Sequence, residues 1–376
     1  MKTKIAVCIP TLNEQDTIAN TANIIDVGLA KYYKDSEAMI VNSDNDSKDN
    51  TRANFLSTPT LSQKVYLKTH DIGKGNNILN FLKFCQKNNI DYAAMIDSDV
   101  KSLKPIWIKK LLNATIKQGF DYVTPVYRRN RFEGSTTNHF AMPIIYTFFG
   151  KVIRQPIGGE FAFNKKYIEY IIKQPVIDST LQYGIDIFMT IHAIGGRFSI
   201  KEVELGKKIH NPSFTKIRFM PRQVMKSALE ALSHYQPSKN GNGRIIFDRH
   251  GIDKSRVFKH KEEAKKMLVE SLKSLMSEQK RIVKTINSTS GEVKFLRGET
   301  SVRQDCWPVI LLEALSISLS KHNYDQIGEA LSIIFLPRTI RLWFWSINQS
   351  ADNVEKDIID QAVETRRLFV QKIFQS

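Results

Sequence analysis

Residues 92–100 read YAAMIDSDV, a short apolar run that ends in Asp97, Ser98 and Asp99. The run predicts a buried strand that delivers two carboxylates to its carboxyl end. In open α/β sheets that edge is where ligands bind. Two carboxylates there can hold a hard divalent cation, and a diphosphate can fill its remaining coordination positions. The alternative is an Asp-rich turn after a strand, and this stretch alone does not separate the two.

The segments around this stretch predict alternating strands and helices. Strands are expected at 4–9, 38–41, 64–68 and 92–96, with helices at 17–30, after a polar loop at 42–51, and at 76–87. This alternation is typical of a parallel sheet with right-handed crossovers. Further along, helices are expected at 105–118, 137–151, 165–173 and 184–195, and strands at 122–127, 161–163 and, as an edge strand, 197–205.

Beyond residue 221 the strand signals stop. Helical patterns cover 225–235, 259–287, 307–320, 324–335, 338–346 and 353–374. We therefore expect two domains, an α/β domain over 1–221 and a mainly helical domain over 222–376.

The chain has 376 residues and a formal net charge of +17. Residues 222–376 contain 25 Lys and Arg against 18 Asp and Glu, so the excess is shared by both halves. A spread of this kind favours general attraction for anionic ligands. No RNA-recognition signature or basic arm is present, so nucleic acid is not the expected partner.

The three cysteines, Cys8, Cys85 and Cys306, are far apart and form no CxxC pair, which is typical of buried thiols in a reducing compartment. The N-terminus leads directly into a predicted strand and has no signal-peptide pattern. No apolar run approaches the roughly 18 residues of a membrane span. We expect a cytoplasmic protein without a membrane span.

Four polar segments follow the predicted strands: PTLNE at 10–14, the loop at 42–51, GKG at 73–75 and DSD at 97–99. In this order and at this spacing they resemble the nucleotide-binding half of a GT-A glycosyltransferase of the family-2 kind. QPIGGE at 155–160, YGID at 183–186 and HN at 210–211 are similar to motifs of retaining glucosyl-3-phosphoglycerate synthases and mannosylglycerate synthases. The resemblance covers about residues 4–215. It implies a Rossmann-like, mostly parallel GT-A domain for a nucleotide-sugar, followed by helices.

The resemblance implies a divalent cation at the DxD motif of residues 97–99. Asp99 and His210 are its expected protein ligands, and Asp97 is expected to meet the ribose or support the ion indirectly. An imidazole ligand leans the preference toward Mn²⁺, with Mg²⁺ also possible. The alternative for His210 is a surface histidine in a Lys-rich loop.

A UDP- or GDP-hexose is the donor that the resemblance implies. The expected nucleotide contacts are Pro10, Thr11, Glu14, Ser43, Asp44, Lys74, Asp97 and Ser98. The glycines beside Lys74 permit close backbone approach, and its ammonium can reach a phosphate. The alternatives are a first-turn helix charge for Glu14 and an ordinary turn for the GKG segment.

The donor sugar is expected to lie against Gly158, Gly159, Glu160 and Asp186. Asp99, Glu160 and Asp186 are the expected catalytic residues. No general base stands out, which agrees with the retaining reaction of the relatives, in which the leaving phosphate helps take the acceptor proton. The alternative for Asp186 is a charge on a helix surface.

The expected acceptor contacts are Arg128, Arg129, Ser135, Thr137 and Asn211. The arginines, together with Arg131, form a basic cluster suited to a carboxylate or phosphate, or else a solvated surface. Ser135 stands where the phosphoglycerate enzymes carry an arginine.

These expectations combine into a metal-dependent glycosyltransferase that moves glucose or mannose to a small anionic acceptor, of the glycerate or phosphoglycerate type, with retention. One alternative is a family-2-like transferase that acts on a lipid phosphate or other acceptor at a membrane surface. Another is a non-catalytic nucleotide-binding, nucleic-acid-binding or scaffold protein. A homodimer could form through the apolar helix at 307–319, for which burial in the core is the other explanation.

Overall fold

The computed structural model describes residues 2–210, 214–241, 251–286 and 306–374. Its contacts divide the chain into two compact units. We call Met1–Tyr127 with Ile157–Pro212 the sheet unit, and Arg128–Pro156 with Ser213–Ser376 the helical unit. Residues 128–156 join the later helices because α5 (Met142–Phe149) packs against α13 (Ala351–Phe374). The division into 1–221 and 222–376 remains a prediction about domains.

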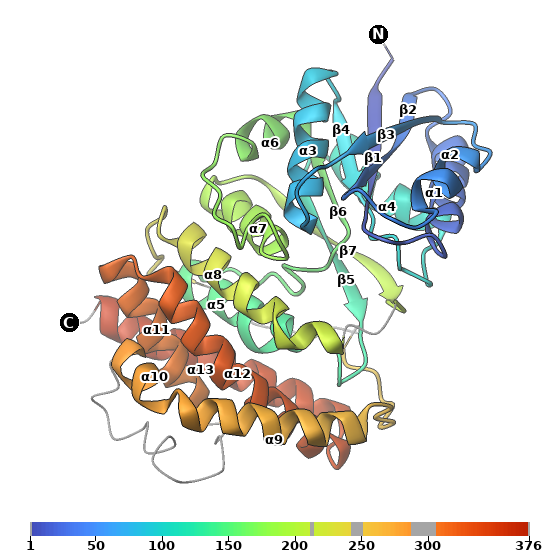
Figure 1. Cartoon of the computed structure of the whole chain (residues 1–376). Coiled ribbons are helices and arrows are strands. Elements are labelled where there is room, and N and C mark those ends of the chain that lie inside the picture. Colours follow the sequence, from blue (N-terminus) through green and yellow to red (C-terminus); the bar gives the residue numbers. More distant parts are fainter. Residues whose placement is uncertain (1, 211–213, 242–250, 287–305, 375–376) are drawn as a thin grey trace. The chain divides into compact units, whose positions relative to one another are not determined.

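The sheet unit is built on seven strands in the order β3-β2-β1-β4-β6-β5-β7 (Figure 1). Their bounds are β1 Lys4–Thr11, β2 Glu37–Asp44, β3 Gln63–Lys68, β4 Tyr92–Met95, β5 Tyr122–Arg128, β6 Phe161–Asn164 and β7 Ile200–Lys207. The pairs β1–β2, β2–β3 and β1–β4 are parallel, whereas β6 runs antiparallel to both β4 and β5. The mostly parallel sheet is thus confirmed.

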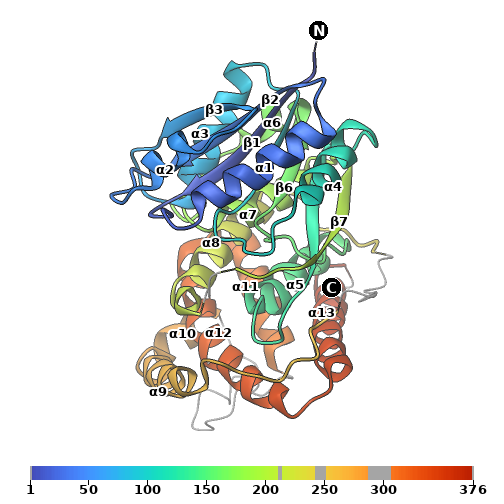
Figure 2. The same ribbon diagram turned by 90° about the vertical axis from the view of Figure 1, so that its right-hand side faces the viewer.

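Helices cover both faces of this sheet (Figure 2). They are α1 Ile18–Tyr32, α2 Thr51–Ser57, α3 Lys74–Lys87, α4 Pro105–Ile116, α6 Lys165–Ile171 and α7 Ile185–Gly195. Alternate residues of β1 point to opposite faces. Ile5 and Val7 join the core with α1 and α4, while Cys8 lies on the side of Cys85 in α3. Both thiols are buried, and the described cysteines form no disulfide.

The helical unit confirms the mainly helical C-terminal region. Its elements are the π-helical turn η1 Thr137–Ala141, α5, η2 Thr215–Arg218, α8 Met220–Leu232, α9 Lys261–Ser277, α10 Gln279–Ile286, α11 Trp307–Lys321, α12 Tyr324–Ile347 and α13. The expected helices at 324–335 and 338–346 are one helix, α12, with Pro337 inside it. Packing of α12 against α8 and α9 outweighs the local preference of proline to end a helix.

This continuous α12 corrects the expectation that no segment approaches the length of a membrane span. Within the described ranges it is the one helix that is long and apolar enough, with a mean hydropathy of 1.2. That is evidence from length and composition alone. Because 61% of its most apolar window is buried inside the structure, packing in the protein core explains the same composition.

Helix α11 buries apolar residues around most of its circumference and contacts α12 and α13. This burial accounts for its composition within one chain. Dimerisation through residues 307–319 therefore stays a prediction.

Candidate active site

The polar loops that follow β1 and β2 bind each other at one edge of the sheet. Asn13 donates its backbone N–H to Ser47 Oγ at 2.8 Å and accepts from the Lys48 N–H at 2.9 Å. The Glu14 N–H donates to Thr51 Oγ1 at 2.7 Å, and its carboxylate accepts from Thr17 Oγ1 at 2.8 Å. Glu14 therefore sits just before α1, where a nucleotide contact remains a prediction.

The expected base contacts are engaged within the protein. Asp44 is buried and accepts hydrogen bonds from Thr11 Oγ1 at 2.6 Å and Tyr66 Oη at 3.0 Å. Ser43 Oγ, also buried, donates to the carbonyl of Asn77 at 2.8 Å. Pro10 pairs with Ser43 in the parallel β1–β2 register. In this structure these side chains fix the loop edge, and their contact with a base remains a prediction.

The GKG segment is explained by a close backbone approach. The N–H of Gly75 donates to the Gln182 carbonyl at 3.0 Å, so the chain at 180–182 closes over the start of α3. A Cβ at Gly75 would lie 2.0 Å from the Thr180 carbonyl oxygen, and Gly73 has a φ of +146°. Both glycines are required by the fold, and they present the Lys74 side chain to the acidic residues beyond β4.

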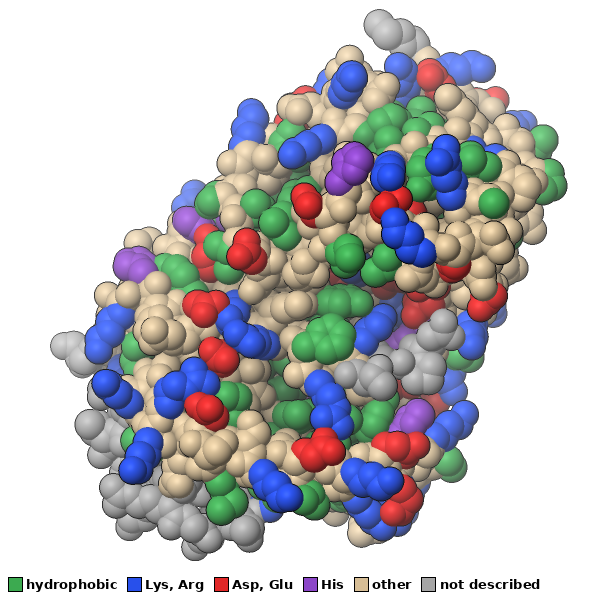
Figure 3. Space-filling model, in the orientation of Figure 1, with side chains coloured by type: hydrophobic (Ala, Val, Ile, Leu, Met, Phe, Trp, Pro, Cys, Tyr) green, Lys and Arg blue, Asp and Glu red, His purple; other side chains and the backbone are tan. Residues whose placement is uncertain are grey.

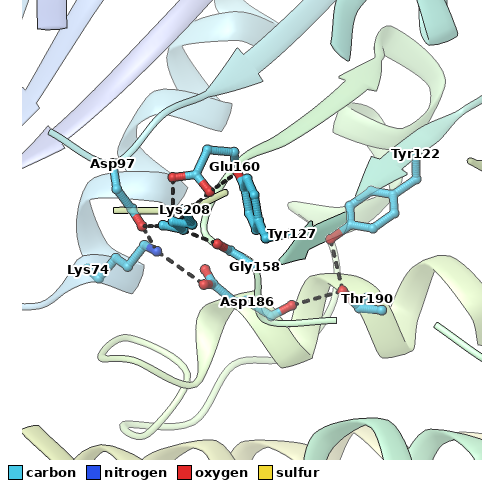
Figure 4. A network of polar contacts seen from close by, with 9 residues as sticks. All are labelled: Lys74, Asp97, Tyr122, Tyr127, Gly158, Glu160, Asp186, Thr190 and Lys208. Atoms are coloured by element: carbon cyan, nitrogen blue, oxygen red, sulfur yellow. Dashed lines mark hydrogen bonds and ion pairs between the residues drawn. The ribbon is translucent and has the colours of Figure 1, made fainter. Parts of the chain in front are cut away.

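Five charged side chains form one continuous network in the sheet unit (Figure 4). Lys74 Nζ lies 3.0 Å from Asp97 Oδ1 and 3.1 Å from Asp186 Oδ2. Lys208 Nζ lies 3.6 Å from Asp97 Oδ2 and 2.8 Å from Glu160 Oε2. We call this set, in the order Asp186, Lys74, Asp97, Lys208 and Glu160, the charge network. Two ammonium groups alternate with three carboxylates.

The Glu160 end of the charge network is the most deeply buried. Glu160 is 0% and Lys208 5% exposed. Lys208 also donates to the Gly158 carbonyl at 2.8 Å, and Tyr127 Oη donates to Glu160 Oε2 at 2.5 Å. A buried carboxylate is tolerated only when it is paired and hydrogen-bonded, and these contacts supply both.

Burial and pairing shift the titration of this network in opposite ways. Burial raises the pKa of Glu160, against the opposing charge of Lys208. Burial likewise raises the pKa of Asp186, against Lys74. Burial alone would lower the pKa of Lys74, but the carboxylates of Asp186 and Asp97 together outweigh it and raise that pKa. Lys74 is therefore a permanent positive charge at neutral pH.

Gly159, in the QPIGGE segment at 155–160, lies against the charge network. Its φ is +95°, and a Cβ there would lie 2.2 Å from Asp97 Oδ2 and 3.0 Å from Lys208 Nζ. The missing side chain thus makes room for the Asp97 carboxylate. The proposed contact of Gly158 and Gly159 with a donor sugar remains a prediction.

The two expected cation ligands lie on paired segments. Val100 and His210 form an antiparallel bridge, and the Lys101 N–H donates to the Ile209 carbonyl at 2.8 Å. Asp99 is therefore next in sequence to the residue opposite His210. The part of the chain that the structure describes contains no group of three or more His, Cys, Asp or Glu side chains that could hold a metal. Coordination of a cation by Asp99 and His210, with diphosphate and water oxygens as its other ligands, remains a prediction. Ser98 is buried, and its carbonyl accepts from Thr21 Oγ1 at 2.8 Å.

Four of the five expected acceptor residues belong to the helical unit. Arg128 is exposed, while Arg129 donates from Nε to Gln155 Oε1 at 3.0 Å. Ser135 Oγ accepts from Trp343 Nε1 at 2.9 Å, and Thr137 is buried in η1. Asn211 lies outside the described residues.

The basic cluster expected at 128–131 is divided. Arg131 is buried and donates to the carbonyls of Ser346, at 2.6 Å, and Gln349, at 2.8 Å. It satisfies backbone groups at the end of α12. The expectation that Arg131 faces a ligand together with Arg128 and Arg129 is therefore wrong.

Two members of the site were missed by the sequence analysis, Lys208 and Tyr127. Lys208 stands in the charged stretch KKIH and gives no sign by itself of being buried. Its place two residues before His210 was the only available signal. Tyr127 lies in a predicted strand, where an aromatic residue is ordinary.

We expect Lys208→Met to lower the free energy of unfolding by about 3–5 kcal/mol, because it leaves Glu160 as an unpaired buried charge. Adding Glu160→Gln to this variant should restore much of the loss. Urea unfolding of the two single variants and the double variant measures the coupling. The neighbouring Lys207→Met, at an exposed position, should change stability by no more than about 0.5 kcal/mol. Equal losses at 207 and 208 would contradict the pairing.

Gly159→Ala should destabilise the protein more than Gly119→Ala does, by about 1–3 kcal/mol. Both glycines have positive φ, at +95° and +75°, but a Cβ at Gly119 meets nothing within 4 Å. The comparison therefore separates the clash with Asp97 from the strain of the backbone. Equal effects in chemical denaturation would show that only backbone strain matters.

Comparison with known proteins finds a family match for the first part of the chain. Residues 6–175 match the model of Glycosyl transferase family 2. No curated protein matches the chain. Similar solved structures include glucosyl-3-phosphoglycerate synthase from Mycobacterium tuberculosis with Mn²⁺, UDP-glucose and phosphoglyceric acid. It has 23% sequence identity and a TM-score of 0.51, over 66% of this chain and 86% of that chain.

Two further structures of the same Mycobacterium tuberculosis enzyme are similar at 22% identity and a TM-score of 0.50. One holds Mg²⁺ and UDP, with coverage of 63% of this chain and 81% of that chain. The other holds Mn²⁺, UDP-glucose and glycerol 3-phosphate, with coverage of 65% and 84%. These structures show the shared GT-A fold. Residues 6–175 are therefore a glycosyltransferase domain of family 2.

Proposed function

We propose that this glycosyltransferase moves glucose or mannose from a UDP- or GDP-hexose to a small anionic acceptor of the glycerate or phosphoglycerate type, with retention. The similar structures hold Mn²⁺ or Mg²⁺ with UDP or UDP-glucose, and phosphoglyceric acid or glycerol 3-phosphate. Two observations support the proposal: the charge network around Asp97, and the Val100–His210 bridge, which brings the segments of Asp99 and His210 together.

The charge network suits an anionic donor because its lysines compensate its acids. Three carboxylates alone would repel a diphosphate, since two like charges 4 Å apart cost about 4 kcal/mol near a protein surface. Lys74 and Lys208 reduce the formal charge of the network to −1. A divalent cation beside it would make the site positive.

Asp99 and His210 would hold that cation. When bound, the cation would act as a Lewis acid that stabilises the departing diphosphate. Asp97 is less suited to direct coordination, because each of its oxygens already faces a lysine, Oδ1 toward Lys74 and Oδ2 toward Lys208. Its role is to hold the two lysines.

The two other carboxylates take different roles. Lys208 and Tyr127 bind both oxygens of Glu160, so this residue positions its neighbours. Asp186 uses Oδ2 for Lys74, while its buried Oδ1 has no hydrogen-bond partner among the described residues. That oxygen is the network's available acceptor for a sugar hydroxyl.

We further propose that the acceptor is a small molecule and that the enzyme is cytoplasmic. On the face seen in Figure 3, basic and acidic side chains are interspersed, and no single-sign patch of the kind that binds nucleic acid is evident there. The burial of α12 gives no support to a membrane-bound acceptor.

The donor is tested by thermal unfolding with UDP-glucose, GDP-glucose or GDP-mannose, each with Mn²⁺. One of them should raise the melting temperature, because a ligand that binds only the folded state stabilises it. Asp99→Ala should remove the Mn²⁺-dependent part of that rise and abolish metal-dependent transfer, whereas Asp35→Ala, at an exposed position, should keep both. A full Mn²⁺ response in Asp99→Ala would reject the cation assignment.

The acceptor site is tested separately through steady-state kinetics. Arg128→Ala should raise the KM for glycerate or 3-phosphoglycerate about tenfold or more and change the donor KM little, because an exposed guanidinium would bind the acceptor anion. Arg222→Ala, which removes an exposed arginine from α8, serves as the control. Equal KM values for wild type and Arg128→Ala would exclude Arg128 from the acceptor site.

A further inference from the structure

Helix α12 contains a buried arginine whose hydrogen-bonding capacity is largely unused. Arg338 is 1% exposed. Its Nη2 donates to Gln361 Oε1 of α13, and its guanidinium lies 4.8 Å from the ring of Trp307 in α11. Nε and Nη1 have no acceptor among the described residues. Because a guanidinium has five N–H donors, most of them are left without a partner.

The contacts present do not compensate this buried charge. A cation–π contact recovers only part of the free energy that burying an unpaired ion costs. The nearest compensating carboxylate, Asp357, acts at one remove, since Gln361 Nε2 donates to its Oδ2 at 2.6 Å. Burial lowers the pKa of Arg338 to about 9 despite the opposing effect of Asp357.

A second buried polar group lies beside Arg338. His139, in the π-helical turn η1, is buried, and its Nδ1 has no partner in the part of the chain that the structure describes. Its carbonyl accepts from Trp307 Nε1 at 2.7 Å. Burial lowers the pKa of His139 well below its usual value, as do the charges of Arg338 and Arg154, and together they outweigh a hydrogen bond to Gln361, so the ring is neutral. Single π-helical turns are frequent at functional sites.

We propose that these four residues, His139, Trp307, Arg338 and Gln361, form a binding site for a small oxyanion, a phosphate or a carboxylate. The guanidinium supplies the N–H donors and the positive charge that such an anion needs. A water molecule could satisfy the N–H groups but would leave the positive charge uncompensated. The site lies within the helical unit and does not depend on the proposed transfer reaction.

The test compares sodium phosphate, sodium acetate and sodium chloride at equal ionic strength in thermal unfolding of the full chain. Phosphate or acetate should raise the melting temperature by about 2–4 °C at saturation relative to chloride. The anion that acts identifies the ligand as phosphate-like or carboxylate-like. Arg338→Met should lose the rise. Arg367→Met, which removes an exposed arginine paired with Glu364 on α13, should keep it.

Hydrogen exchange of the wild-type chain locates the bound anion without a variant. The effective anion should slow exchange of the backbone amides of 137–141. If Arg338→Met does not fold, Arg338→Lys keeps the charge but loses the planar donors, and it should bind about tenfold more weakly. The proposal is overturned by equal melting temperatures in all three salts, by an undiminished rise in the Arg338 variant, or by slowed exchange confined to the sheet unit.

Discussion

A single carboxylate, Asp97, lies between two lysine ammonium groups, and the site in the sheet unit is arranged around that contact. Lys74 approaches one of its oxygens from the start of α3, and Lys208 approaches the other from beyond β7. The lysines in turn hold Asp186 and Glu160. Segments that are distant in sequence are thus joined by alternating charges at the carboxyl end of β4, and Gly159 must lack a side chain for them to meet.

This arrangement explains why two aspartates two residues apart can have different roles. Both oxygens of Asp97 face ammonium groups, so coordination of a cation by Asp97 would require displacing one of them. Asp99 instead adjoins Val100, which pairs with His210. The two aspartates of the DSD segment are thus used differently. Asp97 compensates the charge of the lysines, and Asp99 is left for the proposed cation.

The sequence predicted elements whose pattern is local, and it missed contacts that depend on distant partners. The strand and helix alternation through β4 and the position of the DSD segment at its end followed from periodicity. The antiparallel direction of β6 did not, because four residues, FAFN, carry no information on direction. Lys208 looks like any surface lysine until Glu160, 48 residues away, is placed beside it. The division of α12 at Pro337 followed a local rule that packing overrides.

The positive charge of the helical unit has an interior component that a charge count cannot show. Arg131 donates to the carbonyls of Ser346 and Gln349, and Arg366 donates to those of Tyr146 and Thr147. Both are buried, and their guanidinium groups satisfy carbonyls at the ends of helices. Part of the basic excess is therefore structural, which weakens the inference from net charge to a nucleic-acid surface. Arg338 is equally buried but has no such carbonyls among the described residues. Because Arg131 and Arg366 in the same unit find backbone acceptors, the N–H groups of Arg338 that lack one point to a bound anion.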